Sequence, residues 1–204
     1  MAKVKKTKSA LKAERESLAR FHRFLPTLEL KKQQLQAEVR RADSEFRKKA
    51  EEEAELRAQL RTWVKLFSSD INPGGYIELA EVRTTTGNIA GVNVPLFEEA
   101  VFRRAPVDLF ETPAWLDDAL DLLEKLVGLR VEQSILARQR DLLSEELRVT
   151  SQRVNLFEKV KIPETEENIR VIQIALGDAQ TAGVIRSKIA KSKSASVSAG
   201  EGAT

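Results

Sequence analysis

The chain has 204 residues, of which 32% are charged and only 5% aromatic, and its formal net charge is +3. It contains no cysteine and one histidine, His22, which excludes disulfides, cysteine-ligated metals and zinc sites with two histidine ligands. The phosphate-binding patterns GxxxxGK[ST] and GxGxxG are both absent. We therefore expect a non-catalytic protein with no catalytic residues, no cofactor-binding residues and no metal site.

Apolar stretches last only a few residues, and the basic N-terminus is not followed by an apolar segment. These features predict neither a membrane span nor a secretory signal, so we expect a cytoplasmic protein. Proline and glycine are concentrated in residues 68–114, which hold four of the six prolines and four of the nine glycines. The composition predicts a basic extension at 1–8, a first coiled-coil helix at 9–67, a β-hairpin-containing insert at 68–114, a second coiled-coil helix at 115–190 with a kink near 163, and a disordered tail at 191–204.

The first flank carries a repeat of 3.5 residues. Alternate steps of three and four residues from Leu11 to Phe67 visit 17 positions, and 13 of them are apolar. The exceptions are Glu14, Lys32, Lys49 and Glu53, and Pro26 is expected to bend the helix without ending it. Such a repeat is typical of a coiled-coil seam. Its principal residues are Leu18, Phe21, Leu25, Leu28, Leu35, Val39, Phe46, Leu56, Leu60 and Trp63.

The second flank begins with an N-cap signal at Thr112 and Pro113, and the same stepping from Trp115 gives ten apolar residues in 14 positions. Its seam residues are Leu122, Leu126, Leu129, Leu136, Leu143, Leu147, Val154 and Phe157. Matching seams on either side of a short insert predict an all-α fold, a long antiparallel two-helix coiled coil with a small β-hairpin at the chain reversal. In this register Phe46 lies opposite Leu136, with an allowance of one heptad. The alternative is an extended rod that dimerises in trans.

The insert reads as two strands, 76–86 and 89–97, joined by a turn at Gly87 and Asn88, with 100–104 as an optional third strand. Pro95 restricts the second strand to an edge. Because a bare hairpin is marginal in water, we expect it to pack against the helices or against a partner. The candidate contact residues are Ile77, Leu79, Val92, Val94 and Phe97.

Charged residues suggest a second contact surface. If the helices are antiparallel, basic clusters near the two ends of the chain meet at one tip, which would bind a partner through Lys5, Lys6, Lys8, Arg186, Lys188 and Lys191. The alternative is a pair of solubilising tails. We expect Glu51, Glu52 and Glu53 to form a solvated face and His22 to lie at the surface.

Four segments resemble the D subunit of the V-type (V/A-type) ATPases. Asn88–Pro95 is similar to the family's Asn-x-x-Gly-Val-x-x-Pro segment, and Thr150–Pro163 with Asn168–Ile172 resembles its Arg-Arg-Val-Asn-Ala-Leu-Glu-x-x-x-Ile-Pro…Thr-Ile block. Thr7–Leu11 and Leu28–Leu35 look like the family's first helix. The resemblance covers residues 4 to about 190, with Leu156 and Phe157 in place of the usual Ala-Leu pair.

This resemblance implies a central rotor shaft whose paired termini sit inside a hexamer of catalytic (A) and non-catalytic (B) proteins. The other end would contact the small F subunit and the funnel protein, called C or d, above the membrane ring. The implied function is torque transmission between ATP hydrolysis or synthesis and ion translocation, with no nucleic acid and no direct membrane insertion. A prefoldin-like chaperone and a coiled-coil adaptor remain the alternatives.

Overall fold

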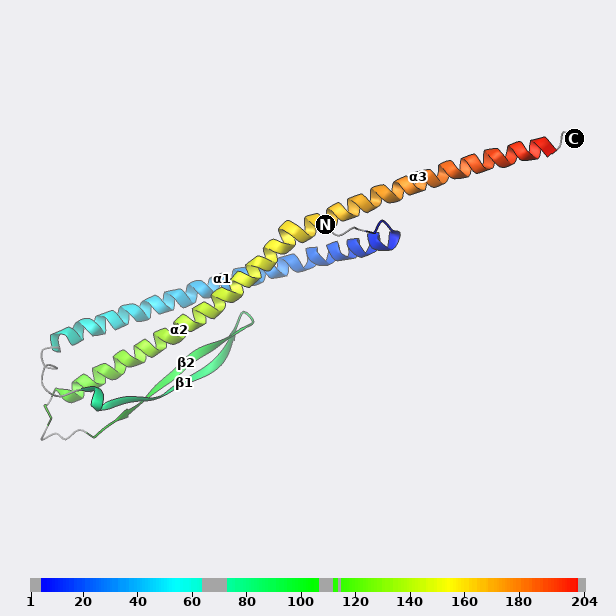
Figure 1. Cartoon of the computed structure of the whole chain (residues 1–204). Helices are drawn as coiled ribbons and strands as arrows, with labels where there is room; N and C mark the ends of the chain where they lie inside the picture. Colours follow the sequence, from blue (N-terminus) through cyan, green and yellow to red (C-terminus); the bar gives the residue numbers. More distant parts are fainter. Residues whose placement is uncertain (1–4, 64–72, 107–111, 114, 202–204) are drawn as a thin grey trace. The chain divides into compact units, whose positions relative to one another are not determined.

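The computed structural model describes residues 5–63, 73–106, 112–113 and 115–201 (Figure 1). Helix α1 (Lys8–Trp63) is followed by the 3-10 turn η1 (Pro73–Gly75), strands β1 (Ile77–Ile89) and β2 (Val92–Arg104), and helix α2 (Leu116–Leu156). A π-helical turn, η2 (Phe157–Lys161), connects α2 to helix α3 (Ile162–Glu201). Long helices and a single antiparallel hairpin in these residues confirm the predicted fold class. The predicted end of the first helix at residue 67 falls outside the described residues.

The chain divides into two compact units. One unit contains Leu30–Ser151, and the other contains the residues up to Glu29 together with those from Gln152 onward. Each unit is described by itself below.

In the unit Leu30–Ser151, α1 and α2 pair in antiparallel directions. Three ion pairs join them, at 2.7 Å between Lys31 and Glu146, 3.8 Å between Asp43 and Arg140, and 3.3 Å between Lys49 and Glu132. As the residue number rises along α1, it falls along α2, and the numbers in each pair add to between 177 and 183. This direction confirms the predicted antiparallel coiled coil.

Burial along the helices follows the seam. Each position of the three-and-four stepping from Leu11 to Leu60 is buried or half-buried, including the polar exceptions. All the predicted seam residues whose side chains the structure describes, which excludes Trp63, share this burial. Helix α2 also buries a second apolar stripe, because the hairpin runs alongside it (Figure 1). That stripe contains Leu116, Leu120, Leu123, Val127 and Ile135.

The hairpin reverses at Ala90 and Gly91, whose φ angles are 51° and 80°. A two-residue hairpin turn of this kind requires positive φ at both central residues. The predicted turn at Gly87 and Asn88 is therefore wrong by three residues. Asn88 instead closes the loop from inside β1, since its Nδ2 donates to Asn93 Oδ1 at 2.9 Å and its Oδ1 accepts from the Gly91 amide at 3.1 Å.

Both strands are longer than expected. They pair from Ile77 opposite Arg104 to Ile89 opposite Val92, and the register shifts at Ala80 in β1 and at Glu98 in β2. The optional third strand is therefore the end of β2. Gly87 lies within β1 close to Leu96, since a Cβ there would be 2.6 Å from Cδ1 of Leu96 and that exposed side chain would have to move.

Three elements meet in one small core. Leu35 of α1, Val94 of β2 and Leu143 of α2 are 0–1% exposed and pack together. Half-buried residues surround them, namely Val39, Ile89, Ala90, Val92 and Leu147. Close by, Gln139 Nε2 donates to the carbonyl of Pro95, which gives the hairpin a polar contact with α2 as well.

In the other unit, the start of α1 lies against η2 and the neighbouring helical residues. The rings of Phe21 and Phe157 are 5.3 Å apart, and Val154, Ile162 and Ile172 are buried. At the predicted kink the structure has the π-helical turn, in which the Ile162 amide donates to the Phe157 carbonyl. The turn ends two residues before Pro163, whose backbone nitrogen has no hydrogen to donate and whose ring crowds the preceding helical turn.

Helix α3 continues to Glu201, whereas the composition predicts a disordered tail from residue 191. Lysine and alanine favour helix, and serine disfavours it only weakly, so a polar composition alone does not end a helix that is already formed.

We expect Leu143→Ala to lower the free energy of unfolding by about 2–5 kcal/mol, because it opens a cavity between three elements. Leu142→Ala is the matched control, since its side chain is 37% exposed at the adjacent position and should cost less than about 1 kcal/mol. Urea unfolding followed by circular dichroism measures both. Equal losses in the two variants would contradict the assigned core.

Candidate functional site

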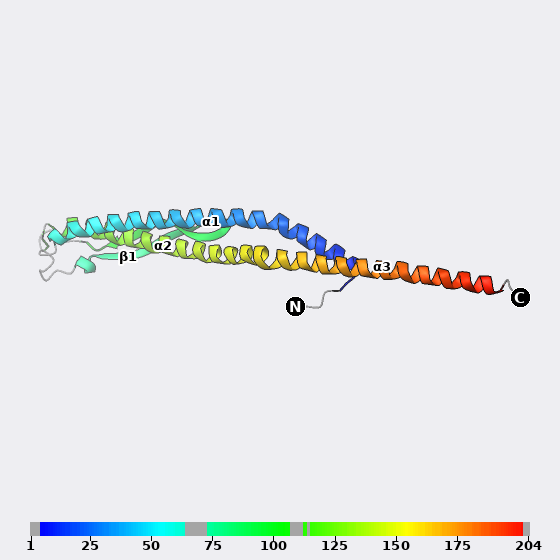
Figure 2. The same ribbon diagram turned by 90° about the horizontal axis from the view of Figure 1, so that it is seen from above.

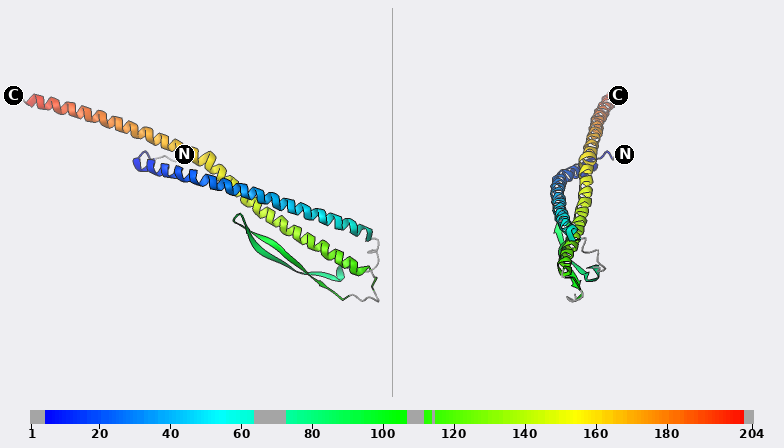
Figure 3. Two further views of the ribbon diagram at one scale, coloured as in Figure 1. Left: turned by 180° about the vertical axis from the view of Figure 1, so that it is seen from behind. Right: turned by 90° about the vertical axis from the view of Figure 1, so that its left-hand side faces the viewer.

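The predicted basic tip consists of exposed residues, but its two halves lie apart. Because Phe21 contacts Phe157, the same register places Lys8 opposite about residue 170. Arg186 is then roughly 24 Å further along α3, at about 1.5 Å per residue. All the views show α3 continuing well past the start of α1 (Figures 2 and 3). The prediction that both clusters meet at one tip is wrong, because the second helical arm is much longer than the first.

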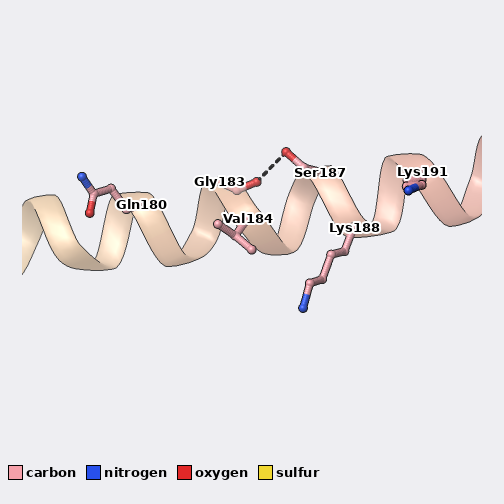
Figure 4. Close-up of a pocket in the computed structure, with 6 residues that line it drawn as sticks. All are labelled: Gln180, Gly183, Val184, Ser187, Lys188 and Lys191. Carbon is pink, nitrogen blue, oxygen red and sulfur yellow. Dashed lines mark hydrogen bonds between the residues drawn. The ribbon is translucent and has the colours of Figure 1, made fainter.

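The end of α3 presents a mixed apolar and basic surface. Val184, Ile185 and Ile189 are 50–56% exposed, and the exposed Arg186, Lys188 and Lys191 are interspersed with them. A shallow groove on this helix is lined by Gln180, Gly183, Val184, Ser187, Lys188 and Lys191 (Figure 4). Ser187 Oγ donates to the Gly183 carbonyl at 3.0 Å, so this hydroxyl bonds to its own helix. We call Val184, Ile185, Arg186, Lys188, Ile189 and Lys191 together the α3 surface.

Sequence reasoning identified only the basic half of the α3 surface as a contact site. The missed signal is that the apolar stripe of the second helix continues beyond the residues that α1 can cover. An apolar stripe without a partner helix indicates a surface available to another protein.

The hairpin residues predicted to bind a partner fall into two groups. Val94 is fully buried in the core with Leu35 and Leu143, and Val92 packs against the same core. Val94 is therefore closed to a partner, whereas Val92 keeps part of its surface exposed. Ile77 and Phe97 are half-buried, and Leu79 is 38% exposed. The outward-facing apolar residues of the hairpin are therefore Leu79, Val82 and Leu96.

A cleft runs between the hairpin and the two helices. Its apolar floor includes Leu96 and Phe97 from β2 and Ile135 from α2, and its rim carries Glu38 and Glu45 from α1. These residues provide neither a nucleophile with a neighbouring base nor a cradle for phosphate. In the described part of the chain, no group of three or more His, Cys, Asp or Glu side chains is arranged to hold a metal. In the same residues, no helix is both long and apolar enough to cross a membrane.

Arg104 anchors the base of the hairpin to the first turns of α2. Its guanidinium donates to Asp121 Oδ1 at 2.6 Å and to both carboxylate oxygens of Glu124 at 2.6–2.8 Å. The hydrogen bond from Arg104 lowers the pKa of Glu124, and those to the two carboxylates raise the pKa of Arg104. The clamp joins the end of β2 to α2 across an intervening segment of chain.

A second polar contact lies within the seam. Gln133 Nε2 donates to the Lys49 carbonyl at 2.9 Å and to Glu53 Oε2 at 2.8 Å. The hydrogen bond from Gln133 lowers the pKa of Glu53, whose side chain is only 13% exposed. Glu51 and Glu52 are solvated as expected, but Glu53 is not, because it occupies a seam position. The exposed His22 lies at the surface as expected.

Comparison with known proteins provides the family. The family model for the D subunit of ATP synthases matches residues 10–192. The chain is 44% identical over 192 residues to the V-type ATP synthase D subunit of Borreliella burgdorferi, covering 94% of this chain and 95% of that protein.

Two chlamydial proteins are also similar. The V-type ATP synthase D subunit of Chlamydia pneumoniae is 36% identical over 193 residues, covering 93% of this chain and 92% of that protein. The corresponding protein of Chlamydia felis is 34% identical over 195 residues, covering 94% of each. The structure has a long antiparallel coiled coil and a hairpin whose sequence resembles the family's segment. Together with the family model and these relatives, these features show that the chain belongs to the family of ATP synthase D subunits.

Proposed function

We propose that the chain is the central rotor shaft of a rotary V-type ATPase or ATP synthase. It transmits torque between ATP hydrolysis or synthesis in the catalytic hexamer and ion translocation in the membrane ring. Membership of the D-subunit family and the coiled-coil architecture support this assignment. In this role the chain is a non-catalytic cytoplasmic component, peripheral to the membrane.

The proposed partners are the A and B proteins of the hexamer, the small F subunit and the funnel protein C or d. The α3 surface is suited to a protein partner such as the hexamer, because its exposed valine and isoleucines can be buried there while its lysines and arginine can pair with acidic side chains. The outward-facing hairpin residues Leu79, Val82 and Leu96 are candidates for contact with a further component of the complex. These two candidate contact surfaces lie on separate parts of the chain, one on α3 and the other on the hairpin.

The proposal rests on the packing of α2, which is covered by α1 on one side and by the hairpin on another. The seam and its ion pairs hold α2 to α1, while the Leu35–Val94–Leu143 core and the Arg104 clamp hold it to the hairpin. A shaft must resist slip between its elements when one end is turned against a load. Close packing supplies that resistance, because packed interiors transmit strain.

Single-molecule rotation tests the proposal directly. The chain has no cysteine, so Glu81→Cys on the exposed face of β1 provides a unique attachment point for a bead. In the assembled complex with the hexamer immobilised, the bead should rotate when ATP is supplied. A complex given a non-hydrolysable ATP analogue is the control, and its bead should stay fixed.

A stationary bead in a complex that hydrolyses ATP would contradict the rotor assignment. The isolated chain should not hydrolyse ATP, so turnover by the pure protein that a point substitution in this chain abolishes would contradict its non-catalytic role.

The Arg104 clamp makes attachment of the hairpin dependent on pH. The pKa of Glu124 is lowered in the folded state, so its contribution to stability is complete above its ordinary value of 4.5 and is lost as the pH falls through the lowered value. Arg104→Gln should therefore lower the stability at pH 7 by about 1 kcal/mol or less, because the clamp is partly exposed. The difference should shrink as the pH falls below about 4.5.

Thermal unfolding of the two proteins between pH 3 and pH 7 measures this difference. Arg103→Gln is the matched control, because Arg103 is the exposed neighbour and should leave the pH profile unchanged. A difference between the native chain and Arg104→Gln that is as large at pH 3 as at pH 7 would exclude the carboxylate clamp as its cause.

A further inference from the structure

The apolar part of the seam does not define a unique alignment of the two helices. Leucine and other apolar residues recur along α1 with a heptad repeat, so sliding α1 by seven residues places apolar side chains against apolar side chains again. Hydrophobic contact is non-directional, and it distinguishes such alignments only weakly. Some other interaction must select the observed register.

The contact between Gln133 and Glu53 has the required directionality. Gln133 is 9% exposed, and its amide nitrogen bonds both the backbone carbonyl of Lys49 and the carboxylate of Glu53. The other carboxylate oxygen of Glu53, Oε1, forms an ion pair with Nη2 of Arg57 at 2.7 Å. Both members of the pair thus lie on the seam, largely removed from water, and the Gln133 amide nitrogen and both Glu53 carboxylate oxygens have partners.

A one-heptad shift destroys this contact in either direction. The position opposite Gln133 that Glu53 now occupies would be taken by Phe46 or by Leu60. Neither side chain accepts a hydrogen bond, so the amide would lose its side-chain acceptor. Glu53 itself would move to the level of Leu126 in one direction and of Arg140 in the other. Leaving buried polar groups without partners is the costly outcome.

The neighbouring ion pair acts in the same sense in one of the two directions. Arg140 lies 3.8 Å from Asp43 and over the ring of Phe46, at 5.7 Å from its centroid. After a one-heptad shift in one direction, Gln36 would replace Asp43 and Arg140 would lose its carboxylate partner on α1. In the other direction Ala50 would replace Asp43, but Glu53 would take the place of Phe46 beside Arg140. Because this pair is more exposed than Gln133, its contribution to discrimination is smaller.

We propose that Gln133 and Glu53 are positioning residues that select the register of α1 against α2. The register determines which α1 side chain meets Leu143 and Val94, so it also sets where the hairpin is seated. Replacing the pair by apolar residues removes this selection without removing the helix pairing. The proposal concerns the chain alone, so it can fail or hold independently of the rotor assignment.

Disulfide trapping of the full chain tests the proposal. Phe46→Cys with Leu136→Cys reports the native register, whereas Phe46→Cys with Leu129→Cys and Leu60→Cys with Leu129→Cys report shifts of one heptad in the two directions. A disulfide requires Cα atoms within about 7 Å, and one heptad is about 10 Å of helix. In the otherwise native chain, only the first pair should cross-link efficiently.

In a Gln133→Leu/Glu53→Leu background, the ratio of native to shifted cross-links should fall by about tenfold or more. The thermal midpoint should stay the same or rise, because replacing a buried polar contact by packed apolar residues is often neutral or stabilising. Gln139→Leu is the matched control: Gln139 is equally buried on α2 but bonds the hairpin carbonyl of Pro95, so the cross-link ratio should not change.

Glu53→Gln is the conservative variant, since it retains an acceptor for Gln133 and should preserve the native ratio. It also keeps the test decisive if the double-leucine chain does not fold, because Gln133→Leu can then be compared with Glu53→Gln in the same assay. An unchanged ratio in a folded variant that lacks the Gln133 contact would overturn the proposal. A ratio that falls equally in Gln139→Leu would do so as well.

Discussion

The rest of the structure depends on the packing of Val94 between Leu35 and Leu143. A two-stranded hairpin cannot bury enough apolar surface to be stable alone, so β1 and β2 require a surface to rest on. The two helices provide it where one side chain from each meets Val94. Only the hairpin turn at Ala90 and Gly91, stabilised by Asn88, brings β2 to that point in the correct register. The small core thus links a local turn to the pairing of helices that are distant in sequence.

Apolar and polar contacts have separate tasks in this arrangement. Burial of the seam supplies most of the free energy that holds the helices together, because it is proportional to area and continues over many turns. Directional contacts such as Gln133 with Glu53 and Arg104 with Glu124 contribute less energy but depend on one alignment. Towards the end of α3 the balance changes, since Ile185 and Ile189 remain exposed there. That end is where we propose contact with another protein of the complex.

The heptad pattern was sufficient to predict the helices, their antiparallel pairing and the seam, because burial in a coiled coil repeats with the sequence. It did not reveal the second buried stripe of α2, although Leu116, Leu120 and Ile135 carry that signal. The hairpin turn was misplaced because Gly87 and Asn88 resemble a turn in sequence, whereas the positive φ angles fall at Ala90 and Gly91. The meeting of the basic clusters was wrong because composition does not measure the unequal lengths of the two arms. The sequence left open whether Val94 contacts the helices or a partner, because a strand's inward face is known only once its neighbour is placed.

The central claim is that hairpin and helices form one cooperative body through the Leu35–Val94–Leu143 core. Native-state hydrogen exchange of the full chain measures this most directly, by comparing the opening free energy of the amides around Val94 in β2 with those around Leu143 in α2. The account predicts that the two sets open together, with free energies equal within about 1 kcal/mol. Exchange of the β2 amides through a separate low-energy opening, while the amides around Leu143 stay fully protected, would contradict it.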